Sequence, residues 1–185
     1  MAVTAITGEI GSGKSTASHI LAGLLGCEYI NADSIAKSLW ERSDVKARAA
    51  GRWGRGILDA SGRIILALAA ERIFSSKAEH DFCNALLHPL VMSELQEMVQ
   101  GRDAVLEIPL LPEAGRPKWI DRVIYVAAKF ETRAERVRAR GWDAEELRRR
   151  ESFLLPERER IAVCNIVIRN DGGTDELQRQ LEEAK

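Results

Sequence analysis

The chain has 185 residues, of which 45% are hydrophobic and 30% charged, and its formal net charge is −1. A chain of this length buries roughly 70% of the surface that its unfolded form exposes, so it can fold without disulfides or a structural metal. The composition excludes a disordered or collagen-like protein, and the near-zero charge argues against nucleic acid or an anionic membrane as a partner over a large surface.

The cysteines and the apolar runs bear on the cellular compartment. Cys27, Cys83 and Cys164 lie far apart and form no CxxC pair, which favours reduced thiols over a disulfide framework or a zinc site. No basic residue precedes Lys14, so we expect no secretory signal. The longest apolar run, Ile64 to Ala70, is too short to cross a membrane. We therefore expect a cytoplasmic protein with no membrane partner.

A phosphate-binding loop follows the first predicted strand, residues 2–7. The segment from Gly8 to Ser15 has the sequence GEIGSGKS and matches GxxxxGK[ST]. Apolar residues at helical spacing follow it as far as Gly26, which is expected to end the helix. Glycines allow the backbone to turn its N–H groups toward phosphate oxygens, and the helix N-terminus adds positive charge character at the same place. The strand, loop and helix together predict nucleoside triphosphate binding.

The residue types in this loop suggest separate roles. Lys14 is expected to reach the terminal phosphates, and the Ser15 hydroxyl to bind Mg²⁺. Thr16 is expected to contact the α-phosphate through its N–H or its hydroxyl. The expected ATP-binding residues of the loop are Gly8, Gly11, Ser12, Gly13, Lys14, Ser15 and Thr16.

The second predicted strand, residues 27–30, precedes a candidate catalytic base. Ligands bind beyond the carboxyl ends of the strands in open parallel sheets, so Asp33 is placed to accept the proton of an attacking hydroxyl. An equally good interpretation makes Asp33 or Ser34 the N-cap of the next helix, and the two roles are compatible.

The region 34–100 is mostly helical in pattern and reads as an insertion. Pro89 disfavours a helical conformation at His88, so we expect a helix break there. His88 is then either a residue of an acceptor cleft or a structural histidine. His19 and His80 are expected at solvated helix positions.

The next apolar run, residues 104–111, contains a carboxylate. Glu107 comes late in this predicted strand, and a buried carboxylate there needs a partner, such as water bound to Mg²⁺. The alternative is an edge position that faces solvent.

A highly charged helical region, residues 130–161, follows a strand at 123–128. Its arginines alternate with acids, so many are expected in surface salt bridges, and a nucleic-acid patch is disfavoured. Arg133, Arg136 and Arg140 are spaced to share one helix face. As a lid, this region would bring Arg136 and Arg140 onto ATP during phosphoryl transfer.

A last strand around 166–168 and a helix at 174–183 complete an alternating pattern. It predicts an α/β fold with a parallel sheet covered by helices on both faces. We expect one domain, with core segments 1–33, 101–129 and 162–185, an acceptor-binding insertion at 34–100 and a lid at 130–161.

Five segments resemble the bacterial dephospho-coenzyme A kinases, nearly end to end. The family's forms of them are TGGIGSGKST, DAD-x-I-A-R, LLHPL, IPLLFE and AD-x-VI-x-N. The corresponding segments here are Thr7 to Thr16, Asn31 to Lys37, Leu86 to Leu90, Ile108 to Glu113 and Cys164 to Asn170.

This resemblance implies a P-loop nucleotide-kinase fold with a five-stranded parallel sheet, a helical insertion and a helical lid. It also implies ATP- and Mg²⁺-dependent phosphorylation of the ribose 3′-hydroxyl of dephospho-coenzyme A. Asp33 would be the base, Arg136 and Arg140 would clamp phosphates, and Asn170 would lie near adenine. The oligomeric state stays open, with a monomer favoured.

Some positions depart from the family pattern, and two alternatives follow. Glu9 stands for a glycine, Asn31 for an aspartate, Leu66 for an arginine and Leu154 for a glutamine. The changes at Leu66 and Leu154 motivate a related kinase for another nucleoside or nucleotide. A nucleotide-binding regulatory ATPase is the alternative from a different class.

Overall fold

The computed structural model describes residues 1–185, which form two units. The larger unit comprises Met1–Ala32 and Val99–Lys185, and the smaller one Asp33–Met98. That the chain forms a single domain stays a prediction.

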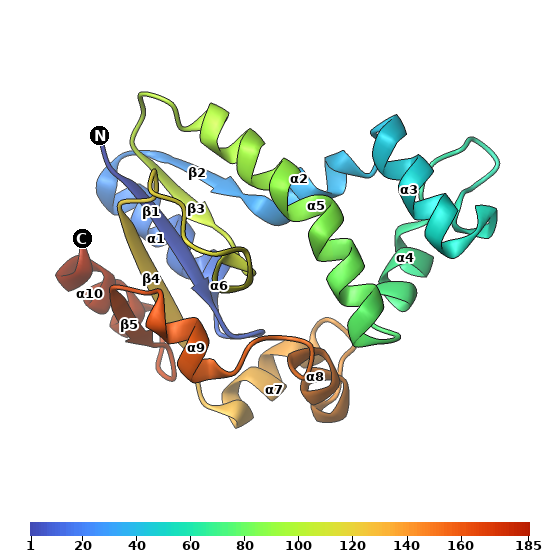
Figure 1. The fold of residues 1–185 in the computed structure, drawn as a ribbon. Helices are drawn as coiled ribbons and strands as arrows, with labels where there is room; N and C mark the ends of the chain where they lie inside the picture. The colour runs from blue at the N-terminus through green and yellow to red at the C-terminus, as the bar shows by residue number, and fades with distance from the viewer. The chain divides into compact units, whose positions relative to one another are not determined.

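A five-stranded sheet forms the centre of the larger unit (Figure 1). The strand order is β2-β3-β1-β4-β5, and each neighbouring pair is parallel. All carboxyl ends therefore lie at one edge of the sheet, as the sequence pattern predicts. The strands are β1 (Val3–Gly8), β2 (Glu28–Asn31), β3 (Ala104–Glu107), β4 (Arg122–Ala127) and β5 (Ile166–Arg169).

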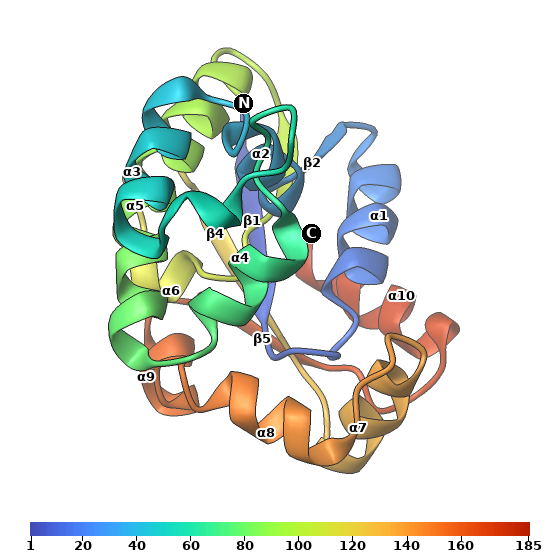
Figure 2. The ribbon, with the colours of Figure 1, turned by 90° about the vertical axis from the view of Figure 1, so that its right-hand side faces the viewer.

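Helices cover both faces of this sheet (Figures 1 and 2). The first and last helices of the unit, α1 and α10, lie together on one face, and α6 and α9 lie on the other. The helices are α1 (Lys14–Leu25), α6 (Leu111–Ala114), α7 (Phe130–Arg138), α8 (Ala144–Glu151), α9 (Glu157–Ala162) and α10 (Thr174–Ala184).

The main apolar core lies between the sheet and the α1–α10 pair. Ile6 on β1 and Val105 on β3 pack there with Leu21 of α1 and Leu181 of α10. Residues of β1, β3 and nearly all of β4 are buried, because these inner strands have helices on both faces. Continuous apolar strands follow from that double coverage.

The smaller unit is helical. It contains most of α2 (Ala32–Leu39), then α3 (Ser43–Trp53), a 3₁₀ turn (Arg55–Ile57), α4 (Leu66–Ile73) and α5 (Lys77–Met98). The Trp53 ring lies 6.1 Å from Trp40 and 5.5 Å from Phe82, in an edge-to-face arrangement with the latter. Aromatic packing of this kind holds α3, α5 and the turn after α2 together.

Two expectations for this unit are wrong. Helix α5 runs without interruption through Pro89, so no break occurs at His88. His88 lies half-buried within the helix, and its Nε2 has no hydrogen-bond partner. His80 is only 3% exposed instead of solvated, since it lies on the inner side of α5 near the Phe74 ring. His19, by contrast, is exposed as expected and lies against the Tyr29 ring.

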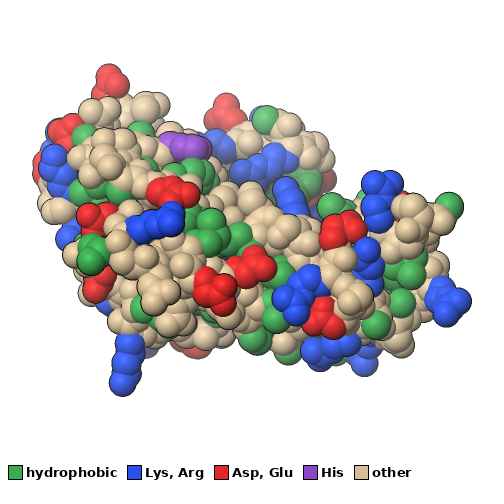
Figure 3. All heavy atoms as spheres, turned by 90° about the horizontal axis from the view of Figure 1, so that it is seen from above, with side chains coloured by type: hydrophobic (Ala, Val, Ile, Leu, Met, Phe, Trp, Pro, Cys, Tyr) green, Lys and Arg blue, Asp and Glu red, His purple; other side chains and the backbone are tan.

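The surface in Figure 3 shows no large charged patch, as the low net charge leads one to expect. Acidic and basic side chains lie next to one another on the face in Figure 3, without a broad area of one sign. No helix combines the length and the apolar character that a membrane span requires.

Candidate active site

The phosphate loop connects β1 to α1 and depends on glycine. Gly8, Gly11 and Gly13 have φ values of 146°, 77° and 94°. A Cβ atom on Gly8 would lie 2.1 Å from the Val126 carbonyl oxygen, and one on Gly13 would lie 2.4 Å from Asn170 Nδ2. Both the backbone conformation and the neighbouring atoms therefore require glycine in this loop.

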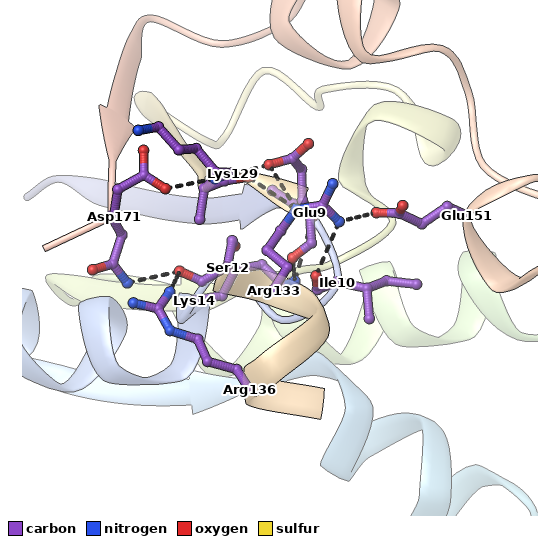
Figure 4. A network of polar contacts seen from close by, with 12 residues as sticks. Glu9, Ile10, Ser12, Lys14, Lys129, Arg133, Arg136, Glu151 and Asp171 are labelled. Carbon is purple, nitrogen blue, oxygen red and sulfur yellow. Dashed lines mark hydrogen bonds and ion pairs between the residues drawn. The ribbon is translucent and has the colours of Figure 1, made fainter. Parts of the chain in front are cut away.

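Side chains of other elements hold the loop from outside. Asn170, directly after β5, donates from Nδ2 to the Ser12 carbonyl at 2.7 Å, and Arg136 of α7 donates to the same oxygen at 3.2 Å (Figure 4). Asn170 is buried, and its own N–H donates to the Ala127 carbonyl, so it is fixed to β4 as well. The loop is therefore held from two neighbouring elements, the end of β5 and α7.

Lys14, the first residue of α1, curls back over the beginning of the loop. Its Nζ donates to the carbonyl oxygens of Glu9 at 2.8 Å and Gly8 at 3.3 Å. An ammonium group and a helix N-terminus thus lie at the same place, which is a site for anions.

A buried carboxylate lies beside the loop at the end of β3. Glu107 is 4% exposed, and its oxygens accept hydrogen bonds from Ser15 Oγ at 2.8 Å, Tyr29 OH at 2.5 Å and Asn31 Nδ2 at 3.1 Å. Asn31 is opposite Glu107 in the β2–β3 register, which explains this contact. The prediction of a buried carboxylate that needs a partner is confirmed, and the alternative of a solvent-facing edge position is wrong, because β3 lies between β2 and β1.

Asp33 lies in the first turn of α2, two residues after the end of β2, and is exposed. Helix α2 already begins at Ala32, so the interpretation of Asp33 or Ser34 as its N-cap is wrong. In the first turn, the Asp33 carboxylate is stabilised by the helix dipole instead. Thr16 is exposed, while Ser12 is buried with no partner for Oγ.

The predicted common face of three arginines is wrong. Arg133 and Arg136 lie one turn apart on α7, but this helix ends at Arg138, and Arg140 is exposed in the turn beyond it. Arg133 is buried. Many of the other charges in this region pair along a helix as expected, for example Arg149 with Glu146 in α8.

A buried ion-pair cluster beside the loop had no signal in the sequence. Glu9 is 7% exposed, and its Oε2 accepts from the Ala128 N–H at 2.9 Å and lies 3.4 Å from Arg133 Nε. Arg133 also contacts Glu151 at the end of α8 (Figure 4). Burial raises the pKa of Glu9, an effect that the Ala128 N–H and Arg133 partly offset.

Comparisons with known proteins cover almost the whole chain. The family model described as dephospho-CoA kinase matches residues 2–176. The dephospho-CoA kinase of Methylococcus capsulatus is 34% identical, over 98% of this chain and 94% of that protein. The dephospho-CoA kinase of Chlorobaculum tepidum is 36% identical, over 96% of this chain and 90% of that protein.

A solved structure is similar over the same length of chain. The crystal structure of TT1252 from Thermus thermophilus superimposes with a TM-score of 0.78 at 31% identity, covering 99% of this chain and 95% of that one. The chain belongs to the dephospho-CoA kinase family.

Proposed function

We propose that the chain transfers the γ-phosphoryl group of ATP to the ribose 3′-hydroxyl of dephospho-coenzyme A and so forms coenzyme A, the final step of coenzyme A biosynthesis. The observation that carries the proposal is the family match over residues 2–176, which includes an intact phosphate loop with Lys14 and Ser15. In this reaction the hydroxyl oxygen attacks the γ-phosphorus, its proton passes to a base, and ADP leaves.

The loop and its neighbours are proposed to bind ATP. Backbone N–H groups of the loop and the Lys14 ammonium would bind the phosphates, with Arg136 and Arg140 neutralising charge that develops during transfer. The position of Arg136 at the Ser12 carbonyl supports this role for it, whereas Arg140 lies in the turn beyond α7. Asn170, on the same carbonyl, is proposed to lie near adenine.

Oxygen donors at the loop fit a magnesium ion. Mg²⁺ prefers carboxylate, hydroxyl and water oxygens, and the Ser15 hydroxyl and the Glu107 carboxylate lie within 2.8 Å of each other. We propose that Ser15 binds the ion and that Glu107 orients Ser15 and the water around it. When bound, the ion would neutralise phosphate charge.

The assay that tests this function mixes the chain with ATP, Mg²⁺ and one acceptor at a time, and follows ADP and the phosphorylated product together. The acceptors are dephospho-coenzyme A, nucleosides and nucleoside monophosphates. Coenzyme A formation far above the other products is expected. Product from another acceptor would favour a related kinase, for which the 47% exposed Leu66 is the motivating residue. ADP release that needs no acceptor would indicate an ATPase.

Asp33 is the proposed base, and its substitution separates catalysis from stabilisation of the first turn of α2. Asp33→Asn is expected to lower turnover by roughly 10²- to 10⁴-fold with little change in ATP binding, since a proton acceptor is lost and no phosphate contact is. Asp44→Asn is the matched control, because Asp44 is also a first-turn acid, in α3. Equal turnover of the two variants would leave Asp33 with a structural role in the first turn of α2 alone.

A further inference from the structure

The Glu9–Arg133–Glu151 cluster is a candidate for a role beyond simple packing, because of what Arg133 touches. Arg133 is 6% exposed, and its Nε donates to the Ala128 carbonyl at 2.9 Å. Its Nη1 donates to the Ile10 carbonyl of the phosphate loop at 3.3 Å and to Glu151 (Figure 4). One guanidinium therefore joins the loop, the end of β4 and the end of α8.

The contact with Ile10 bears on how the loop presents its N–H groups. In a planar trans peptide the C=O and the next N–H point in opposite directions. Arg133 on the Ile10 carbonyl therefore orients the Gly11 N–H toward the other side of the loop. Arg136 and Asn170 act in the same way on the Ser12 carbonyl and thus on the Gly13 N–H. Phosphate binding by such a loop depends on these N–H directions.

Close packing of α7 against the loop restricts the positions that the loop and Arg133 can adopt. A Cβ atom on Gly11 would lie 3.0 Å from the Arg133 carbonyl oxygen and 3.0 Å from Val137 Cγ1. Helix α7 thus packs directly against the loop. The Arg133 side chain, which starts from this helix, reaches the Ile10 carbonyl of the loop. Its guanidinium also lies 5.6 Å from the Phe130 ring centre, which further restricts its position.

The positive charge of Arg133 also compensates the negative charge of Glu9. Glu9 is an acid within the phosphate loop itself, and an unpaired carboxylate there would repel the phosphates of a nucleotide. With two carboxylates around one guanidinium, the cluster carries a single excess negative charge. Replacing Arg133 by a neutral residue would double the excess negative charge of the cluster. Replacing Glu9 by a neutral residue as well would return the excess to that of the wild type.

We propose that Arg133 is a positioning residue for ATP binding, which fixes the Ile10–Gly11 peptide and neutralises Glu9 in the phosphate loop. This inference rests on the proposed function only in that the bound phosphates are those of ATP. It does not depend on which acceptor receives the phosphoryl group.

The test measures nucleotide affinity in the absence of any acceptor. Binding of Mg²⁺ and AMP-PNP, a non-hydrolysable ATP analogue, is measured by calorimetry at pH 8 for the full chain and for Arg133→Gln, Glu9→Gln/Arg133→Gln and Arg149→Gln. We expect Arg133→Gln to weaken binding by about 10-fold or more, and the double variant to recover at least about half of that loss on a logarithmic scale. Arg149→Gln is the matched control, because Arg149 is exposed and pairs with Glu146 on α8; its affinity should stay unchanged.

Kinetics separate positioning from a general loss of structure. In the phosphorylation assay, Arg133→Gln should raise KM for ATP, with kcat at saturating ATP changed by less than about threefold. Wild-type affinity in Arg133→Gln, or equal weakening in the single and double variants, would overturn the proposal. If coenzyme A did not form but the affinities followed the expected order, the acceptor assignment would fail and the role of Arg133 would stand.

A second variant covers the case in which Arg133→Gln does not fold. Arg133→Lys keeps the charge but cannot contact Ala128, Ile10 and both carboxylates at once. It should bind AMP-PNP about three- to tenfold more weakly than the wild type, and adding Glu9→Gln should bring no recovery, because no charge is left unbalanced. Unchanged affinity in Arg133→Lys, or recovery on adding Glu9→Gln, would overturn the proposal.

Discussion

Tyr125, in β4, is fully buried, yet its hydroxyl has no hydrogen-bond partner. The Arg160 guanidinium lies 5.6 Å from the centre of its ring and is buried as well. Burial raises the pKa of Tyr125, so the phenol stays neutral. The ring fills the core, while the oxygen lost its water contacts on folding and gained no hydrogen bond in return.

Tyr125→Phe should therefore leave the free energy of unfolding unchanged or raise it by up to about 1 kcal/mol, because an unsatisfied buried hydroxyl is removed. Urea denaturation measures this. The only other tyrosine supplies the control: Tyr29 OH donates to the buried Glu107, so Tyr29→Phe should cost about 1–3 kcal/mol. A larger loss in Tyr125→Phe than in Tyr29→Phe would contradict this account.

At the residue scale, the sequence predicts those features of the site that depend on residues close together in the sequence. The phosphate loop is identifiable because its chemistry lies in eight consecutive residues. Glu107 is identifiable as a buried carboxylate that needs a partner, but its donors Tyr29 and Asn31 come from another strand. The pairing of Glu9 with Arg133 likewise requires β1 and β4 to be adjacent, which no local pattern specifies.

At the scale of elements, α5 contains the clearest conflict between local preference and packing. Pro89 has no N–H and lies in the interior of the helix, at an exposed position. Buried residues nevertheless continue at a spacing of four on both sides of it: Cys83, Leu87, Val91 and Leu95. Burial of this continuous stripe outweighs the lost hydrogen bond, and the expectation of a break failed because it considered the proline alone.

Pro89→Ala should therefore stabilise the protein, by about 1–3 kcal/mol, since it restores the hydrogen bond to the Ala85 carbonyl and removes no buried contact. Thermal unfolding followed by circular dichroism measures the change. Pro112 is the matched control, because it lies in the first turn of α6, where proline suits a helix, and Pro112→Ala should bring no gain. A lower melting temperature for Pro89→Ala would show that the proline itself favours the native structure.

The strands, in contrast, follow from the sequence to within about one residue at most ends. Val3–Gly8 was expected at 2–7, and Arg122–Ala127 at 123–128. Inner strands of a parallel sheet are apolar on both faces, so they stand out from their charged surroundings. Strand order has no such local signal: the family resemblance implies five parallel strands, and only the structure gives their order.

At the scale of the whole molecule, the two histidines that are shielded from solvent belong to the smaller unit. His80 is buried and His88 half-buried, and both lie on α5. Burial lowers the pKa of His80, with Lys77 adding to the effect and Asp81 opposing it. Burial and the nearby His80 lower the pKa of His88. The folded state therefore resists protonation at two positions of this unit.

The sign of the pH effect follows from these directions. Between the ordinary histidine pKa of 6.5 and the lowered folded values, the unfolded chain binds protons that the folded chain does not. The stability from these groups is complete above pH 6.5 and is lost as pH falls below it. Carboxylates held low, such as Glu146 with a pKa of about 2, lose their contribution only in more acidic solution.

The melting temperature should accordingly fall between pH 7 and pH 5, before the carboxylates are protonated. Thermal unfolding at half-unit pH intervals is compared for the wild type, His80→Gln/His88→Gln and His19→Gln. The readout is the slope of melting temperature against pH, because removing two side chains that are shielded from solvent also lowers the melting temperature itself. The double variant should flatten the slope, whereas His19→Gln, at an exposed position on α1, should leave it as in the wild type. Equal slopes in all three proteins would mean that α5 does not carry the acid sensitivity of the molecule.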